Sequence, residues 1–258
     1  MSNSNKDANL KEKFKQALNS TFRVISEDFE VSNNLDKNDN SKKFDFLELE
    51  NLNTKSDFIR ARAETDSSAL KKKFSDETIY KKNLPTNSSC KSLYLIAEKI
   101  RYESLGGKML KGIKKNLDNN YNQIISQKRK DQLKTKEDVP VSEAFELYML
   151  KEFLDIELNP LTKKMLNFWE SDFNNSIREH INFLKKNLEN QNDYSSKFSQ
   201  ILEGMDIFEA EDNEQTKDEN QDSGQNNPSN DDQQSENDDN RDENKDEEAE
   251  TSLDSDYD

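Results

Sequence analysis

The sequence LIAEKIRYESLGGKML, residues 95–110, lies within the strongest helical pattern of the chain and decides the fold. At 100° per residue, one stripe of side chains lies within about 60° of Ile100. Its other members are Leu93, Ile96, Ala97, Ser104 and Gly107. Because the stripe shrinks from large apolar residues to Ser104 and Gly107, we expect another helix or a loop to approach the backbone closely there.

The glycines of this helix need a physical reason, since each interior glycine costs about 1 kcal/mol relative to alanine. Gly106 and Gly112 lie off the stripe, so the helix either kinks there or meets a second neighbour on that side. Two interpretations are open. One is a tight helix crossing inside the domain core, with Lys99 and Glu103 as a solvated i, i+4 pair. The other is a contact surface between subunits, with Arg101 and Glu103 as its charged rims.

Helical periodicity continues on both sides of this stretch and predicts a mostly α domain. An amphipathic helix should end near Ile25, and polar residues around short apolar runs between Phe29 and Leu49 suggest one or two short strands. The remaining helices are predicted as follows: one starting at Ser56 and Asp57 and terminated by Pro85; a long one capped by Ser92 and running to about residue 126; VSEAFELYMLKEFL after Pro140; one or two from Thr162 to about residue 190; and a last one closing at Gly204 in a left-handed conformation.

The charge of the chain is concentrated at its C-terminal end. The chain carries a net charge of −16, while residues 209–258 hold 21 acidic and three basic side chains, so the first 208 residues carry about +2. An acidic segment this poor in apolar residues is expected to be disordered. We therefore divide the chain into an N-terminal helix and irregular segment (1–55), a helical domain (56–208) and a disordered acidic tail (209–258).

Composition excludes several classes of function. His180 is the only histidine and Cys90 the only cysteine, so one chain cannot build a His/Cys zinc site or an internal disulfide. No phosphate-binding loop, dinucleotide fingerprint or nucleophile motif occurs, and we expect no catalytic, metal or cofactor site on this chain. A nearly neutral body with an acidic tail also argues against binding to nucleic acid. The absence of a membrane span or signal sequence predicts a cytoplasmic protein.

Two features suggest binding to other proteins. The aromatic residues Phe168, Trp169 and Phe173 form either a core face or an exposed partner patch. The acidic tail has three interpretations: a solvated linker, an electrostatic docking arm for a basic partner, or a chaperone-like tail for proteins that bind nucleic acid.

The segment that runs from Phe58 to Asp118 resembles the N-terminal region of the CobT subunit of the aerobic, ATP-dependent cobaltochelatase. Its most specific part is similar to the family pattern EQARVEALG followed by M.GV..NL. The matching positions are Arg101, Glu103, Leu105, Gly106, Met109, Gly112, Asn116 and Leu117. The resemblance continues through PVSEAFELYMLKEFLDIELNPLTKKMLNFWESDFNN and covers about residues 56–258, including an acidic linker.

The resemblance implies an accessory subunit that works with a AAA+ ATPase subunit and a large chelatase subunit, in a homo-oligomer or ring. Such a complex uses ATP and magnesium to insert cobalt into hydrogenobyrinic acid a,c-diamide. The family also carries a von Willebrand A domain with a DxSxS metal site, which this sequence lacks. We expect either a fragment of a longer chain or a short form.

Under this resemblance the helical domain keeps a partner-binding role. We take as interface candidates Arg60, Arg62, Arg101, Glu103, Gly106 and Gly107. The alternative function is an acidic-tailed adaptor or chaperone-like protein outside cobalamin synthesis.

Overall fold

The computed structural model describes residues 3–29, 52–127 and 135–205, with side chains from residue 9. All described residues belong to one compact unit, Met1–Met205. Its elements are α1 (Asn3–Ser26), α2 (Lys55–Phe74), α3 (Glu77–Lys82), α4 (Ser88–Met109), α5 (Lys111–Gln127), α6 (Val141–Leu154), α7 (Pro160–Asn167), α8 (Glu170–Ile177), the 3-10 helix η2 (Arg178–His180), α9 (Ile181–Lys186) and α10 (Gln191–Glu203). The predicted mostly α fold is confirmed, and the described ranges contain no strand. The strands suggested before Leu49 and the acidic tail lie outside the described residues.

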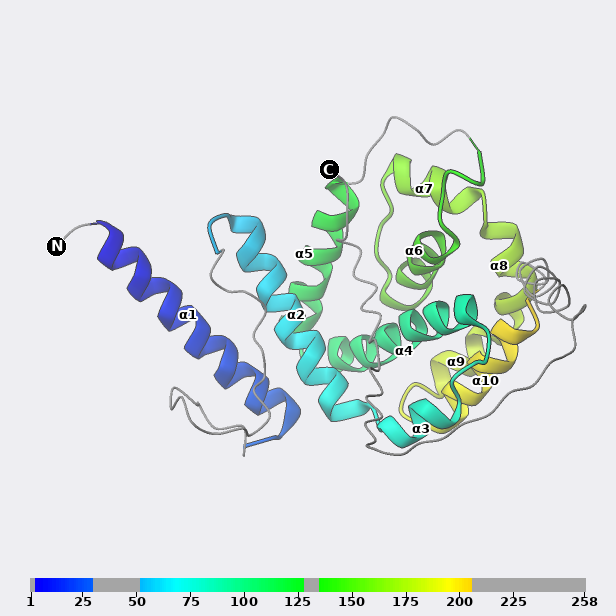
Figure 1. The fold of residues 1–258 in the computed structure, drawn as a ribbon, viewed down its shortest axis with the longest axis horizontal. Coiled ribbons are helices and arrows are strands. Elements are labelled where there is room, and N and C mark those ends of the chain that lie inside the picture. Colours follow the sequence, from blue (N-terminus) through cyan, green and yellow to red (C-terminus); the bar gives the residue numbers. More distant parts are fainter. Residues whose placement is uncertain (1–2, 30–51, 128–134, 206–258) are drawn as a thin grey trace, which may run out of the picture. The chain divides into compact units, whose positions relative to one another are not determined.

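Helix α4 occupies the centre of the domain. It packs against α2 and α5 on one side and against α6 and α10 on the other (Figure 1). Leu93 and Ile100 of the predicted stripe are fully buried, and the six consecutive residues 101–106 are buried as well. A helix buried all round lies inside a core rather than on a surface, so α4 is the element around which the others assemble.

The predicted long helix is in fact two helices. Helix α4 ends at Met109 because Leu110 adopts an extended conformation (φ −138°, ψ 122°), and α5 begins at Lys111. The change of direction therefore occurs at Leu110 and not at a glycine. Leu110 is 48% exposed, so the break leaves an apolar side chain on the surface.

Local capping groups correct the other predicted helix ends. Thr54 caps α2 through a capping box with Asp57, and the hydrogen bonds from Thr54 hold the pKa of Asp57 below its usual value. Asn87, and not Ser92, caps α4. Asp76 caps α3 and so divides the region predicted as one helix up to Pro85. Gly204 ends α10 with φ −92°, which is not left-handed as predicted.

The C-terminal half of the core is built from aromatic side chains. Phe145 of α6 packs edge to face on Phe173 of α8 and Phe198 of α10, with ring centroids 5.6 and 6.0 Å apart. Phe173 is fully buried, whereas Phe168 and Trp169 are partly exposed. The core interpretation of this aromatic group is therefore confirmed for Phe173. The region predicted as one or two helices after Thr162 consists of α7, α8, η2 and α9.

Candidate functional site

A buried ion pair lies at the centre of the domain. Arg101 of α4 is 1% exposed, and its Nε and Nη2 donate to the two carboxylate oxygens of Glu98, both at 2.8 Å. Arg101 Nη1 donates to the carbonyl of Leu188 at 2.8 Å, and its Nη2 also donates to the carbonyl of Phe74. The rigid guanidinium fork thus ties α4 to the end of α2 and to the loop before α10.

Glu98 extends the same network to two other elements. Ser75 Oγ donates to Glu98 Oε1 at 2.6 Å, and Gln191 Nε2 donates to the same oxygen at 3.1 Å. The Gln191 amide also exchanges hydrogen bonds with the backbone of Asp76. Because a buried ion pair is tolerated only when its remaining polar atoms are satisfied, this network positions helices and leaves no group directed at a ligand.

Glu103 forms a second buried cluster. It accepts hydrogen bonds of 2.6 Å from Ser67 of α2 and from Tyr121 of α5. Burial raises the pKa of Tyr121 well above its usual value. Lys99 lies over the Tyr121 ring, 5.7 Å from its centroid. Burial opposes its charge, but the carboxylates led by that of Glu103 raise the pKa of Lys99. Glu103 is 1% exposed, so the prediction of a solvated Lys99–Glu103 pair is wrong.

The close approach predicted along α4 occurs at Gly106. A Cβ added there would lie 2.3 Å from Leu70 Cδ1 and 2.9 Å from Leu70 Cγ, so Leu70 of α2 packs directly on the glycine backbone. At Gly107 the nearest atom to such a Cβ would be Lys114 Cβ, at an ordinary 3.6 Å. The small residue that the crossing needs is therefore Gly106, and the predicted close contact at Gly107 is wrong.

The predicted interface residues fall into two groups. Arg60 and Arg62 lie exposed on α2, and Gly107 is half-buried. Arg101, Glu103 and Gly106 are buried and make the internal contacts described above. Because these three residues are buried, make internal contacts and line neither of the two hollows described below, their assignment to a surface is corrected. An interface role for Arg60, Arg62 and Gly107 stays a prediction.

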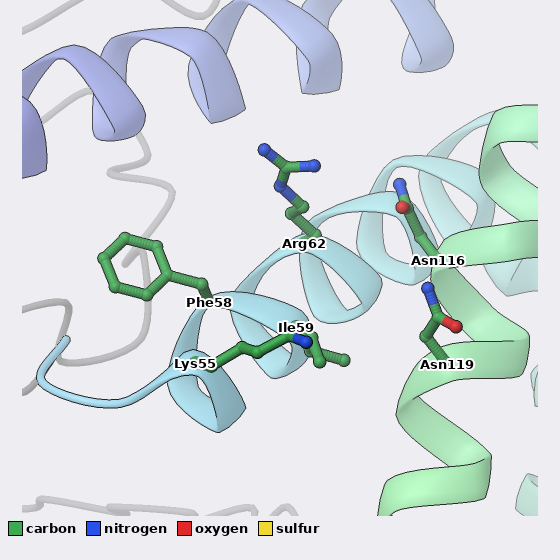
Figure 2. Close-up of a pocket in the computed structure, with 6 residues that line it drawn as sticks. All are labelled: Lys55, Phe58, Ile59, Arg62, Asn116 and Asn119. Atoms are coloured by element: carbon green, nitrogen blue, oxygen red, sulfur yellow. The ribbon is translucent and has the colours of Figure 1, made fainter.

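A small hollow lies between α2 and α5. Its volume is about 250 Å³, and it is lined by Lys55, Phe58, Ile59, Arg62, Asn116 and Asn119. In Figure 2, Arg62 extends toward α1, while Asn116 and Asn119 come from α5. The Arg62 guanidinium lies over the Phe14 ring of α1 with 5.4 Å between Cζ and the ring centroid. Arg62 therefore joins α1 to α2 at the edge of this hollow.

A larger hollow, the α1–α5 groove, shares the lining residue Asn116 with the first. It measures about 460 Å³ and is lined by Ser20, Thr21, Val24, Ile25, Asp66, Leu110, Gly112, Ile113 and Asn116. Asp66 is 2% exposed and accepts a hydrogen bond of 2.8 Å from Asn116 Nδ2. Burial raises the pKa of Asp66, and the Asn116 bond and the charge of Arg62 oppose the increase.

Sequence reasoning missed Asp66 as a site residue. Its signal was an acidic residue next to Thr65, which is buried on α2. A carboxylate so close to the buried face of a helix either has a partner or opens into a cavity.

Cysteine and histidine, which metal sites and nucleophilic catalysis often use, each occur once in the chain. Cys90 is buried on α4. In η2, the Nε2 atom of His180 lies 3.0 Å from Oε1 of Glu179. Within the described ranges no His, Cys, Asp and Glu side chains gather in a way that could hold a metal ion, so those residues do not fit a metal site. None of the helices in the described part combines the length and apolar character of a membrane span.

Comparison with protein-family models gives a match. A family model described as "Cobalamin biosynthesis protein CobT" matches residues 8–258. No curated protein and no solved structure gives a significant match. The matched region includes α2 and α5, which contribute to the groove, the central helix α4, and the acidic segment that follows α10.

Proposed function

Because this chain belongs to the CobT family of cobalamin biosynthesis proteins, we propose that it is an accessory, non-catalytic subunit of an ATP-dependent cobaltochelatase. The family match over residues 8–258 carries the proposal. In this role the chain couples a AAA+ ATPase subunit to a large chelatase subunit that inserts cobalt into hydrogenobyrinic acid a,c-diamide. ATP and magnesium serve the ATPase, and cobalt is the substrate of the large subunit. The complex would act in the cytoplasm.

The placement of charged residues supports a binding role for the helical domain. Arg101, Glu98 and Glu103 are engaged in internal hydrogen bonds, so they stabilise the domain. Arg60 and Arg62 are exposed on α2, and the α1–α5 groove lies on the same domain. A rigid helical body with an open groove suits a subunit that transmits contact between two larger proteins.

Co-purification tests the proposal. The tagged full chain is mixed with the purified AAA+ ATPase and large chelatase subunits of the same organism, in the presence of ATP and magnesium. We expect a stoichiometric complex that contains the ATPase and is larger than a dimer of this chain. Separate elution of the chain and the ATPase, while both are folded, would contradict the proposal.

The acidic segment favours a second candidate, an adaptor or chaperone-like protein for basic partners. Residues 209–258 carry a net charge of −18. Such binding would weaken strongly with salt, since exposed charges are screened over about 8 to 10 Å at physiological ionic strength. Deletion of residues 209–258 would abolish it. Binding to the ATPase that survives this deletion would favour the chelatase role over the adaptor role.

A further inference from the structure

We propose that the α1–α5 groove binds a lysine or arginine side chain of a partner polypeptide, with Asp66 as the counter-charge. The inference deepens the proposed partner-binding function and rests on it for its biological setting. The chemistry of the groove can be tested without the chelatase subunits, so failure of the inference and failure of the proposed function are distinguishable.

Asp66 is the anchor of the site. It is the only charged residue among the described residues that line the groove, and the hydrogen bond from Asn116 is the only one that the structure gives it there. A carboxylate can accept about four hydrogen bonds, so the bond from Asn116 leaves acceptor capacity at Asp66. Its burial makes a cationic donor the partner that would compensate its charge most fully.

The walls of the groove suit the stem of a basic side chain. Val24 and Ile25 of α1 and the apolar residues Leu110 and Ile113 line the groove, and Val24 is 65% exposed. Lysine and arginine place their methylene groups along apolar surface while the charged head reaches a polar group. A volume of about 460 Å³ also lies within the range of pockets that take small ligands or side chains.

Two hydroxyl groups that line the groove, those of Ser20 and Thr21, suit a ligand with several hydrogen-bond donors. Ser20 and Thr21 donate their hydroxyl hydrogens to the carbonyls of Gln16 and Ala17 in the preceding turn of α1, both at 2.9 Å. Their oxygens therefore present lone pairs, and with Asp66 the groove offers acceptors. A guanidinium has five N–H donors and an ammonium has three, and neither has an acceptor.

The nearest competing cation is already placed elsewhere. Arg62, one turn before Asp66 on α2, lines the smaller hollow and holds its guanidinium over Phe14. It does not line the α1–α5 groove. Its charge only partly offsets the burial of Asp66, whose pKa is still raised. Among the described residues that line the groove, none is a cation that could pair with Asp66.

The test is an NMR titration of the ¹⁵N-labelled full chain with the peptide acetyl-Val-Arg-Val-amide. The matched probe is the same peptide with citrulline, which keeps the shape and removes the charge. We expect saturable shifts of the Asp66, Ile113 and Asn116 amides with the arginine peptide up to about 10 mM, and binding at least about tenfold weaker with the citrulline peptide. Equal binding of both peptides, or no shift with either, would overturn the proposal.

Variants of the chain complete the test. Asp66→Asn keeps the shape of the side chain and should weaken the arginine peptide about tenfold or more. Asp118→Asn removes one negative charge from α5 outside the groove and should leave the affinity unchanged. Gly112→Phe fills the groove from a position where a Cβ meets nothing within 4 Å, so it should block binding without disturbing the core. Unchanged binding in Asp66→Asn or in Gly112→Phe would refute the site.

Discussion

Replacing Gly106 with alanine tests the central helix crossing. Alanine gains about 1 kcal/mol of helix propensity over glycine. Against this gain, the new Cβ would lie 2.3, 2.5 and 2.9 Å from Cδ1, Cδ2 and Cγ of Leu70, a fully buried side chain that cannot swing into solvent. Overpacking of a filled core costs about 1 to 3 kcal/mol, and a clash that includes Cγ belongs at the upper end. We expect a net loss of about 2 kcal/mol.

Urea unfolding of the full chain, followed by circular dichroism, measures this loss. Gly107→Ala and Gly112→Ala are matched controls in the same region. A Cβ meets only an ordinary contact at Gly107 and none within 4 Å at Gly112. Both controls should be neutral or stabilising by up to about 1 kcal/mol. A Gly106→Ala variant at least as stable as the wild type would refute the argument that Leu70 needs the glycine.

A double-mutant cycle identifies the cause of the loss. Leu70→Ala alone should cost about 2 to 5 kcal/mol because it leaves a cavity. In the Gly106→Ala background the alanine Cβ occupies part of that cavity, so the two losses should add to less than their sum. Additive losses would show that the effect of Gly106→Ala arises from something other than contact with Leu70.

Three further changes test the buried polar groups. Arg101→Met leaves Glu98 buried without its cation and should lower the free energy of unfolding by about 3 to 5 kcal/mol in urea unfolding; an unchanged midpoint would show that the pair is dispensable. Tyr121→Phe removes a donor to the buried Glu103 carboxylate and should cost about 1.5 to 3 kcal/mol by the same measurement, whereas a loss near zero would mean that water replaces the phenol. Burial raises the pKa of Asp66 above its usual 3.8, so the folded state binds this proton more tightly than the unfolded chain does. The protonated Asp66 therefore contributes to the free energy of unfolding below pH 3.8, and this contribution is lost as the pH rises through the raised pKa of the folded state. Asp66→Asn should therefore become more stable relative to the wild type as the pH rises above 3.8, and a difference that does not vary with pH would contradict the raised pKa.

The elements with strong apolar periodicity could be predicted from the sequence. Helix α6 has the same bounds as the predicted segment after Pro140, and α1 ends one residue beyond the predicted Ile25. The ends of other helices were missed because several Ser, Thr, Asn and Asp residues compete as caps. The caps in the folded chain are the residues whose side chains accept backbone hydrogen bonds: Thr54, Asp76 and Asn87. The sequence alone does not show which of the candidate residues will form such a cap.

The roles of the charged residues were harder to predict. The sequence predicts Arg101 and Glu103 at the charged edges of a contact surface because charged side chains are rarely buried. Each is buried because residues distant in sequence satisfy it: Leu188 and Phe74 for Arg101, and Ser67 for Glu103. The groove at Asp66 likewise depends on how α1, α2 and α5 pack, and on the break at Leu110, which no periodicity in α4 indicated.

Reconstitution of cobalt insertion tests the proposed chelatase role most directly. The large chelatase subunit and the AAA+ ATPase of the same organism are supplied with ATP, magnesium, cobalt and hydrogenobyrinic acid a,c-diamide, with or without the full chain. The change in the absorption spectrum of the macrocycle reports insertion. The account predicts ATP-dependent insertion only when this chain is present. Insertion at the same rate without it, or no insertion with all three folded proteins present, would contradict the account.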